Sequence, residues 1–159
     1  VDRGRRGGMA HEKEIEEKIR GFGREAKCVN VNAADETKRG ATCDALKELL
    51  DGRGEKVRVM LHSLAFGTLR PYWSDEGEPT ITQKNMDMTL DVMAHTTLYW
   101  TQDLLSRDPF VPHRRIFGMT PPVSTSARHG YRPVRAAQSA PASHLRHPPP
   151  QPARTASPA

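Results

Sequence analysis

Apolar residues form two kinds of pattern along the first two-thirds of the chain, one typical of helices and one typical of strands. In three stretches they recur every three or four residues, which places them on one face of an α-helix. These predicted helices span residues 9–19, 36–52 and 82–107. Three short runs rich in β-type residues are predicted strands, at residues 27–32, 57–61 and 114–120. The alternation of helix and strand predicts an α/β fold with a parallel sheet flanked by helices.

Two of the predicted helices carry an apolar stripe that we expect to be buried. In helix 36–52 the expected buried residues are Ala45, Leu46, Leu49 and Leu50. In helix 82–107 the stripe is spaced by three and four residues: Met86, Leu90, Met93, Thr97, Trp100 and Leu104. Because methionine fills irregular gaps between side chains, the simplest role of this stripe is core packing.

The carboxyl ends of the predicted strands bring polar and small residues together. Parallel strands joined by right-handed crossovers share one edge for their carboxyl ends, and ligands bind in the crevice at that edge. We therefore expect Asn32, Ser63 and Thr120 to lie along one rim.

Charge divides the chain into a predicted domain, residues 1–120, and a tail, residues 121–159. Up to Asp108 there are 17 Lys and Arg against 19 Asp and Glu, whereas the remainder has seven arginines and no acidic residue. Nine of the 13 prolines lie from Pro121 onward. Such a segment buries too little apolar surface to offset its ordering entropy, which predicts a disordered tail. A shifted reading frame near Thr120 would also give this composition.

The composition argues against several classes of partner. The excess positive charge lies in the tail, where Tyr131 is the sole aromatic residue after Phe117, so we expect no nucleic-acid partner. No apolar run approaches the roughly 20 residues of a membrane helix. Cys28 and Cys43 fit no metal spacing and no disulfide framework, so we expect no metal and a cytoplasmic protein.

Three motifs give the chain a resemblance to a known family. The run LHSLAFG ends the central predicted strand, and VNVNAADE follows the preceding one. The third motif is RIFGMT, with Tyr131 eleven residues after Thr120. Together they resemble the short-chain dehydrogenase/reductase family, and within it the NADH-dependent enoyl-acyl-carrier-protein reductases.

The resemblance implies a partial Rossmann-like, three-layer fold that binds NAD(H) or NADP(H). The small residues after the central strand would let the backbone approach the cofactor closely. The implied cofactor contacts in this part of the chain are Ser63, Leu64, Ala65 and Thr120. Gly67 would border an enoyl thioester substrate, and the Tyr131 hydroxyl would stabilise or protonate the enolate. His62 is expected to be a satisfied strand-end histidine without a catalytic role.

Two further positions concern the adenosine part of the cofactor. Asn32 falls where the family has an aspartate that binds the adenine amino group, and an amide oxygen can accept the same bond. Asp2 near the expected second strand would hold a ribose 2′-hydroxyl, whereas the adjacent Arg3 would favour a 2′-phosphate. Both residues are present, so the choice between NADH and NADPH stays open.

The sequence also departs from the family pattern. The family begins with a strand, a glycine-rich turn and a helix that binds the pyrophosphate, whereas this chain starts where the second strand would end. Gln138 occupies the position of the catalytic lysine, with Arg135 four residues after Tyr131. A guanidinium is not equivalent to the lysine ammonium, so we expect little turnover by this chain alone.

Two alternatives stay open. Besides the enoyl reductase that the resemblance implies, the chain could be a non-catalytic remnant that forms a homo-oligomer through helix 82–107. It could also be a short-chain dehydrogenase that acts on another carbonyl or alcohol.

Overall fold

The computed structural model describes residues 3–74, 77–119, 134, 137 and 139–140. The chain divides into two compact units, residues 1–32 and residues 33–159.

The first unit consists of helix α1, Arg3–Gly21, and the segment that follows it. Ion pairs one turn apart support the helix, with Lys18 Nζ 2.7 Å from Glu14 Oε1. The helix begins earlier than the predicted residue 9.

The prediction of a strand at residues 27–32 is wrong, because this segment has no strand conformation in the structure. The Cys28 backbone N–H donates to Glu16 Oε1 at 2.9 Å instead of to a neighbouring strand. Val29 is 51% exposed. A β-type run becomes a strand only where a partner strand accepts its hydrogen bonds and a core covers its side chains.

Helix α2, Glu36–Asp51, opens the second unit and matches the predicted helix closely. The Asp35 side chain caps its start by accepting a hydrogen bond from the Lys38 N–H at 3.0 Å. The buried side differs from the prediction. Arg39 and Cys43 are buried, whereas Ala45 is exposed and the three leucines of the predicted face are half-buried. Contacts of Arg39 and Cys43 with helix α4 determine which side of α2 is buried. A local sequence pattern does not contain these contacts.

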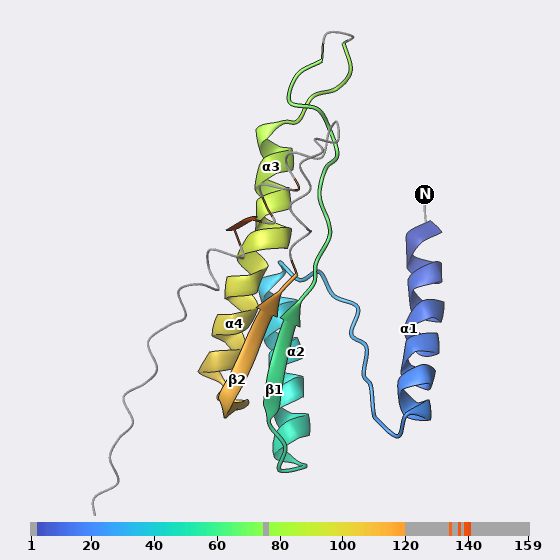
Figure 1. Cartoon of the computed structure of the whole chain (residues 1–159), viewed down its shortest axis with the longest axis vertical. Coiled ribbons are helices and arrows are strands. Elements are labelled where there is room, and N and C mark those ends of the chain that lie inside the picture. Colours follow the sequence, from blue (N-terminus) through green and yellow to red (C-terminus); the bar gives the residue numbers. More distant parts are fainter. Residues whose placement is uncertain (1–2, 75–76, 120–133, 135–136, 138, 141–159) are drawn as a thin grey trace, which may run out of the picture. The chain divides into compact units, whose positions relative to one another are not determined.

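Strands β1, Val57–His62, and β2, Phe110–Gly118, form a parallel two-stranded sheet, in which they lie side by side (Figure 1). Their register pairs Met60 with Ile116 and His62 with Gly118, with an irregularity between Val57 and Val59. The parallel pairing confirms the predicted α/β class. Strand β2 begins four residues before the predicted residue 114.

The predicted long helix, residues 82–107, is interrupted. It consists of α3, Gln83–Leu90, the π-helical turn η1, Asp91–His95, and α4, Thr96–Ser106. Thr82 and Asn85 form a capping box at its start. The predicted core stripe is confirmed, with half of its members buried and the others half-buried. The π turn widens the buried side, which also includes Thr89, Thr96 and Thr101.

Helices α2 and α4 pack on the same face of the sheet (Figure 1). The core between them centres on Cys43 from α2, Leu104 from α4 and Phe110 from β2. Residues on the opposite side of the sheet are more exposed to solvent. The exposed fractions are 49% for Val59, 58% for Leu61 and 47% for Phe117.

A second core cluster joins the tail to the long helix. Val134 and Ala137 are buried and pack with Met93, and Leu90 lies against the three. Both tail residues, like Ser139 and Ala140, have helical backbone. The predicted disorder of residues 121–159 otherwise concerns positions outside the described residues, and the boundary at residue 120 stays a prediction.

Candidate functional site

The two strands end together at one edge of the sheet. His62 pairs with Gly118, and the Met119 N–H donates to the His62 carbonyl oxygen at 2.9 Å. The loop that begins at Ser63 therefore leaves the sheet beside the end of β2. This is the edge at which open parallel sheets bind their ligands.

His62 is held inside the fold at this edge. Its Nε2 lies 2.8 Å from Thr96 Oγ1, and the Thr96 hydroxyl donates to the Val92 carbonyl oxygen at 2.7 Å. Because the hydroxyl has one proton, it accepts from an Nε2–H of His62. Burial lowers the pKa of His62, which favours the neutral imidazole. These contacts confirm the expectation of a satisfied strand-end histidine.

The three loop residues after His62 are accessible. Ser63, Leu64 and Ala65 are all exposed, and Leu64 is 37% exposed. A hydroxyl, one apolar side chain and a methyl group present little bulk, so a ligand can reach the backbone here. The loop follows directly on His62, the last residue of β1.

Gly67 lies further along the same loop and is half-buried. The space that a side chain would occupy is filled by Thr89 from α3 and by Val134. The neighbouring Thr68 N–H donates to Thr89 Oγ1 at 3.2 Å, which fastens the loop to α3. Thr89 lies outside the predicted apolar stripe and Val134 lies in the predicted tail, so the sequence pattern singled out neither residue.

The structure brings together only part of the predicted site. Ser63, Leu64, Ala65 and Gly67 share one loop, whereas Asn32 is an exposed residue at the end of the first unit. The other predicted positions lie outside the described residues: Asp2, Thr120, Tyr131, Arg135 and Gln138.

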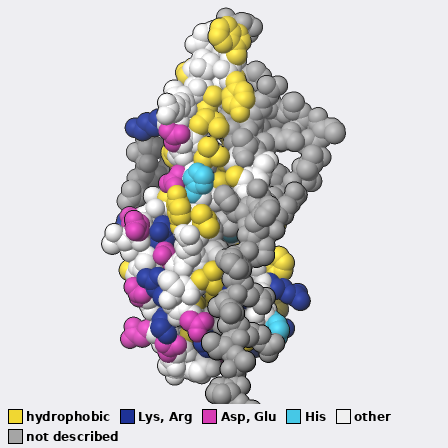
Figure 2. All heavy atoms as spheres, turned by 90° about the vertical axis from the view of Figure 1, so that its left-hand side faces the viewer, with side chains coloured by type: hydrophobic (Ala, Val, Ile, Leu, Met, Phe, Trp, Pro, Cys, Tyr) yellow, Lys and Arg dark blue, Asp and Glu magenta, His cyan; other side chains and the backbone are white. Residues whose placement is uncertain are grey.

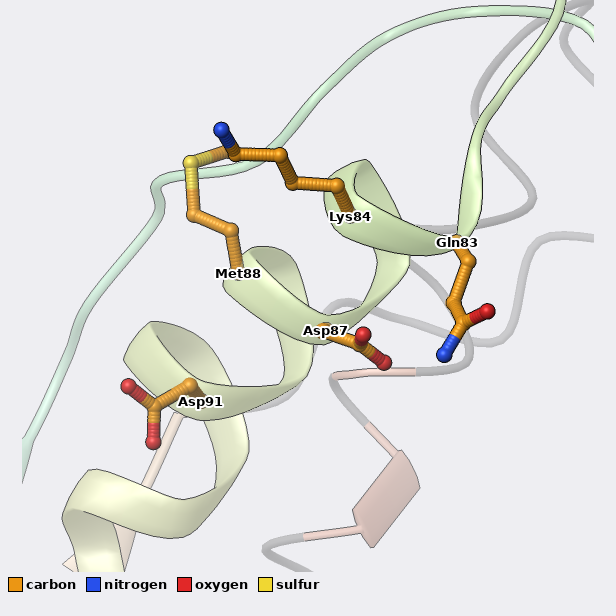
Figure 3. A pocket seen from close by; sticks show the side chains of 5 residues that line it. All are labelled: Gln83, Lys84, Asp87, Met88 and Asp91. Atoms are coloured by element: carbon orange, nitrogen blue, oxygen red, sulfur yellow. The ribbon is translucent and has the colours of Figure 1, made fainter.

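A hollow of about 650 Å³ lies elsewhere, along the long helix. Its described lining residues are Gln83, Lys84, Asp87, Met88 and Asp91 (Figure 3). Lys84 and Met88 extend from one side of α3, and Gln83 and Asp87 extend from the other (Figure 3). All five belong to α3 or to the first residue of η1, so the predicted cofactor loop does not contribute to this hollow.

The described residues contain neither a metal-binding cluster nor a membrane-spanning helix. Among these residues, no three His, Cys, Asp or Glu side chains converge on a point where a metal ion would be held. Within the same part of the chain, every helix is too short or too polar to cross a lipid bilayer.

Comparison with known proteins finds similarity in structure alone. No family model and no curated protein sequence matches the chain. Among solved structures, the enoyl-[acyl-carrier-protein] reductase (NADH) from Aquifex aeolicus VF5 matches with a TM-score of 0.63 and 17% identity. The match covers 85% of this chain and 50% of that one.

Two further structures match equally well. A short chain dehydrogenase from Mycobacterium smegmatis has a TM-score of 0.63 and 16% identity, over 83% of this chain and 52% of that one. A 3-oxoacyl-[acyl-carrier protein] reductase from Brucella melitensis has a TM-score of 0.62 and 16% identity, over the same shares. The chain thus has the Rossmann-like fold of short-chain dehydrogenases and reductases, and it spans about half the length of these structures.

Proposed function

We propose that this chain is a member of the short-chain dehydrogenase/reductase family and contributes the nicotinamide side of an NAD(P)H-dependent reductase site. The observation that supports this most directly is the exposed loop Ser63–Ala65 at the common carboxyl end of two parallel strands. The likeness in fold to reductases of acyl-carrier-protein substrates supports the same class.

The proposed substrate is an enoyl thioester, as the LHSLAFG motif implies by resemblance. A bound nicotinamide would supply hydride to the β-carbon of the substrate. Tyr131 is proposed to give its hydroxyl proton to the resulting enolate oxygen, and Gly67 to border the acyl chain. Gln138 provides no positive charge that would lower the pKa of Tyr131, so we expect slow turnover.

Cofactor binding is proposed for Ser63, Leu64 and Ala65, and also for Thr120. Asn32 is proposed to accept a hydrogen bond from the adenine amino group. Asp2 would select NADH, and its neighbour Arg3 would select NADPH. The proposal therefore includes both cofactors.

Ligand-induced stabilisation tests the proposal without requiring turnover. At about one hundred times its dissociation constant, a bound cofactor adds about 2.7 kcal/mol to the free energy of unfolding. We expect this gain with NADH or NADPH and not with AMP at the same concentration. The absence of any gain with either cofactor would reject the proposal.

The substrate class requires a separate assay. We expect slow oxidation of NADH or NADPH with a crotonyl thioester, and loss of this activity in Tyr131→Phe. Reduction of an acetoacetyl thioester in its place would favour a 3-oxoacyl substrate, an alternative that the Brucella melitensis reductase supports by its fold. Turnover that survives Tyr131→Phe would exclude the proposed role of this tyrosine.

A homo-oligomer through the long helix is also proposed. On the side of the molecule where α3 and α4 lie, hydrophobic side chains form an interrupted line with charged side chains beside it (Figure 2). Met88 and Leu98 on these helices are 37% and 39% exposed. We expect Leu98→Asp to lower the mass measured by light scattering, whereas an exposed substitution on α2, Glu48→Gln, would leave the mass unchanged. A wild-type monomer would reject this part of the proposal.

A further inference from the structure

Gly67 lies where three segments of the second unit meet. A Cβ atom at this position would lie 2.7 Å from Thr89 Cγ2 and 3.1 Å from Val134 Cγ2. Real Cβ atoms essentially never come within 3.0 Å of a heavy atom outside their own residue and its chain neighbours. Only glycine therefore allows the loop after β1 to pass between Thr89 and Val134 at this separation.

The Thr89 side of this contact is fixed. Thr89 is fully buried, and its hydroxyl donates to the Asn85 carbonyl oxygen at 2.7 Å while accepting from the Thr68 N–H at 3.2 Å. Rotation about χ1 would break both hydrogen bonds, and β-branched side chains have few rotamers in a helix. The Cγ2 methyl group that faces Gly67 can therefore move away only if these two hydrogen bonds break.

The Val134 side is anchored as well. Val134 is 6% exposed and Ala137 is fully buried, and both pack with Met93 of η1. The tail is therefore attached to the long helix by apolar contacts and touches the loop after β1 through Val134.

We infer that Gly67 is a positioning residue, one that sets the separation between the loop Ser63–Ala65 and the tail segment at Val134. This inference rests on the proposed function. Val134 follows Tyr131 by three residues, a span of at most about 10 Å of extended chain. A shift of the anchored Val134 would therefore act on the proposed catalytic residue Tyr131 through only three residues of chain.

A rescue experiment in the full chain tests the inference. We expect Gly67→Ala to lower kcat for NADH-dependent reduction of a crotonyl thioester at least about tenfold. The dissociation constant for NADH should change less than about threefold, because Gly67 is not among the proposed cofactor contacts. Thr89→Ser removes the obstructing methyl group and keeps the hydroxyl. The double variant Gly67→Ala/Thr89→Ser should therefore regain most of the lost kcat.

A matched control uses another buried threonine of the long helix. Thr101→Ser also deletes one methyl group, at a residue that is not among the nearest neighbours of Gly67. It should not rescue Gly67→Ala. Unchanged kcat in Gly67→Ala, or equal rescue by both serine variants, would overturn the inference.

A disulfide provides a second measurement for the case in which Gly67→Ala fails to fold. We expect Gly67→Cys and Val134→Cys to cross-link under mild oxidation in a Thr89→Ser background. A Cβ atom at residue 67 would lie 3.1 Å from Val134 Cγ2, which is one bond away from Val134 Cβ, so the two Cβ atoms are close enough for a disulfide. Ser106→Cys with Val134→Cys is the control. Ser106 lies 13 residues from Met93 along the helix, or about 20 Å, and should not cross-link.

The outcomes separate the inference from the proposed function. A wild-type chain without affinity for NADH or NADPH rejects the proposed function, while the cross-link still decides whether Gly67 and Val134 meet. Cross-linking of the 67–134 pair without cross-linking of the 106–134 pair supports the contact on which the positioning role depends. Failure of the 67–134 pair to cross-link overturns it.

Discussion

His62 at the end of β1 and Thr96 at the start of α4 are joined by a hydrogen bond of 2.8 Å between Nε2 and Oγ1. Both residues are buried, and the Thr96 hydroxyl donates a hydrogen bond to the Val92 carbonyl oxygen in the π-helical turn. The bond fastens the last residue of the strand to the helix that covers the sheet. It thereby fixes the point from which the exposed loop Ser63–Ala65 begins.

The His62–Thr96 bond predicts how stability depends on pH. Burial lowers the pKa of His62 below 6.5 in the folded protein. On acidification the unfolded state therefore binds this proton first, so the free energy of unfolding decreases as the pH falls below about 6.5. We expect urea denaturation to show a smaller decrease in His62→Gln, which keeps an amide donor but does not titrate.

A substitution at an exposed histidine provides the control for this measurement. His11 is an exposed histidine of α1, and His11→Gln should retain the pH dependence of the wild-type protein. If His62→Gln and the wild-type protein lose stability in parallel between about pH 7.5 and 5.5, burial of His62 does not govern this transition.

The elements with complete local signals were predicted closely. Helix α2 has an aspartate cap at Asp35 and a glycine at its end, and both its ends agree with the prediction within one residue. Strand β1 is a dense apolar run that leads into small residues. By contrast, Lys27–Asn32 has the composition of a strand without a strand to pair with. The π turn at Asp91–His95 is equally absent from the sequence signal, because a one-residue change of helical phase depends on packing.

Local sequence also limits what could be predicted of the candidate site. Ser63–Ala65 were placed after the central strand by their small size and by resemblance, and the loop is exposed as expected. The contact of Gly67 with Thr89 and Val134 joins residues 22 and 67 positions apart. No periodic pattern contains that contact, so the connection of the tail to the loop became visible only in three dimensions.

An ion pair between α2 and α4 predicts a large effect on stability. Arg39 Nε donates to Asp103 Oδ2 at 2.5 Å, with the two side chains 8% and 27% exposed. The Arg39 guanidinium also lies 5.1 Å from the centre of the Tyr99 ring. Arg39→Met would leave Asp103 partly buried without this partner, so we expect a loss of about 2–3 kcal/mol. Urea denaturation monitored by circular dichroism measures it.

An exposed pair on α2 gives the comparison for Arg39→Met. Lys47 Nζ lies 2.5 Å from Asp51 Oδ2, with the two side chains 43% and 59% exposed, so water reaches this pair more than the Arg39–Asp103 pair. Solvent screens such pairs, so Lys47→Met should cost less than about 1 kcal/mol. Equal losses in the two variants would mean that burial does not strengthen the Arg39–Asp103 pair.

The packing of the tail on Met93 predicts a difference between two tail positions. Val134 is 6% exposed, whereas Ser139 is exposed. Val134→Asp would bury an unpaired carboxylate and should lower the free energy of unfolding by at least about 3 kcal/mol, whereas Ser139→Asp should change it by about 0.5 kcal/mol or less. Thermal denaturation of both variants measures whether the Val134 side chain is packed in the core. Similar melting temperatures would show that Val134 does not enter the core in solution.

The exposed loop predicts a substitution that removes cofactor binding without affecting the fold. Ala65 is exposed beside Ser63 and Leu64, so Ala65→Glu should change the melting temperature of the free chain little. A carboxylate at this position would repel the cofactor phosphates and fill the space that the backbone needs for close approach. We therefore expect loss of the stabilisation by NADH or NADPH. Leu69→Glu, at a residue 64% exposed outside the proposed contacts, should keep that stabilisation. Equal stabilisation of both variants would place the cofactor elsewhere on the molecule.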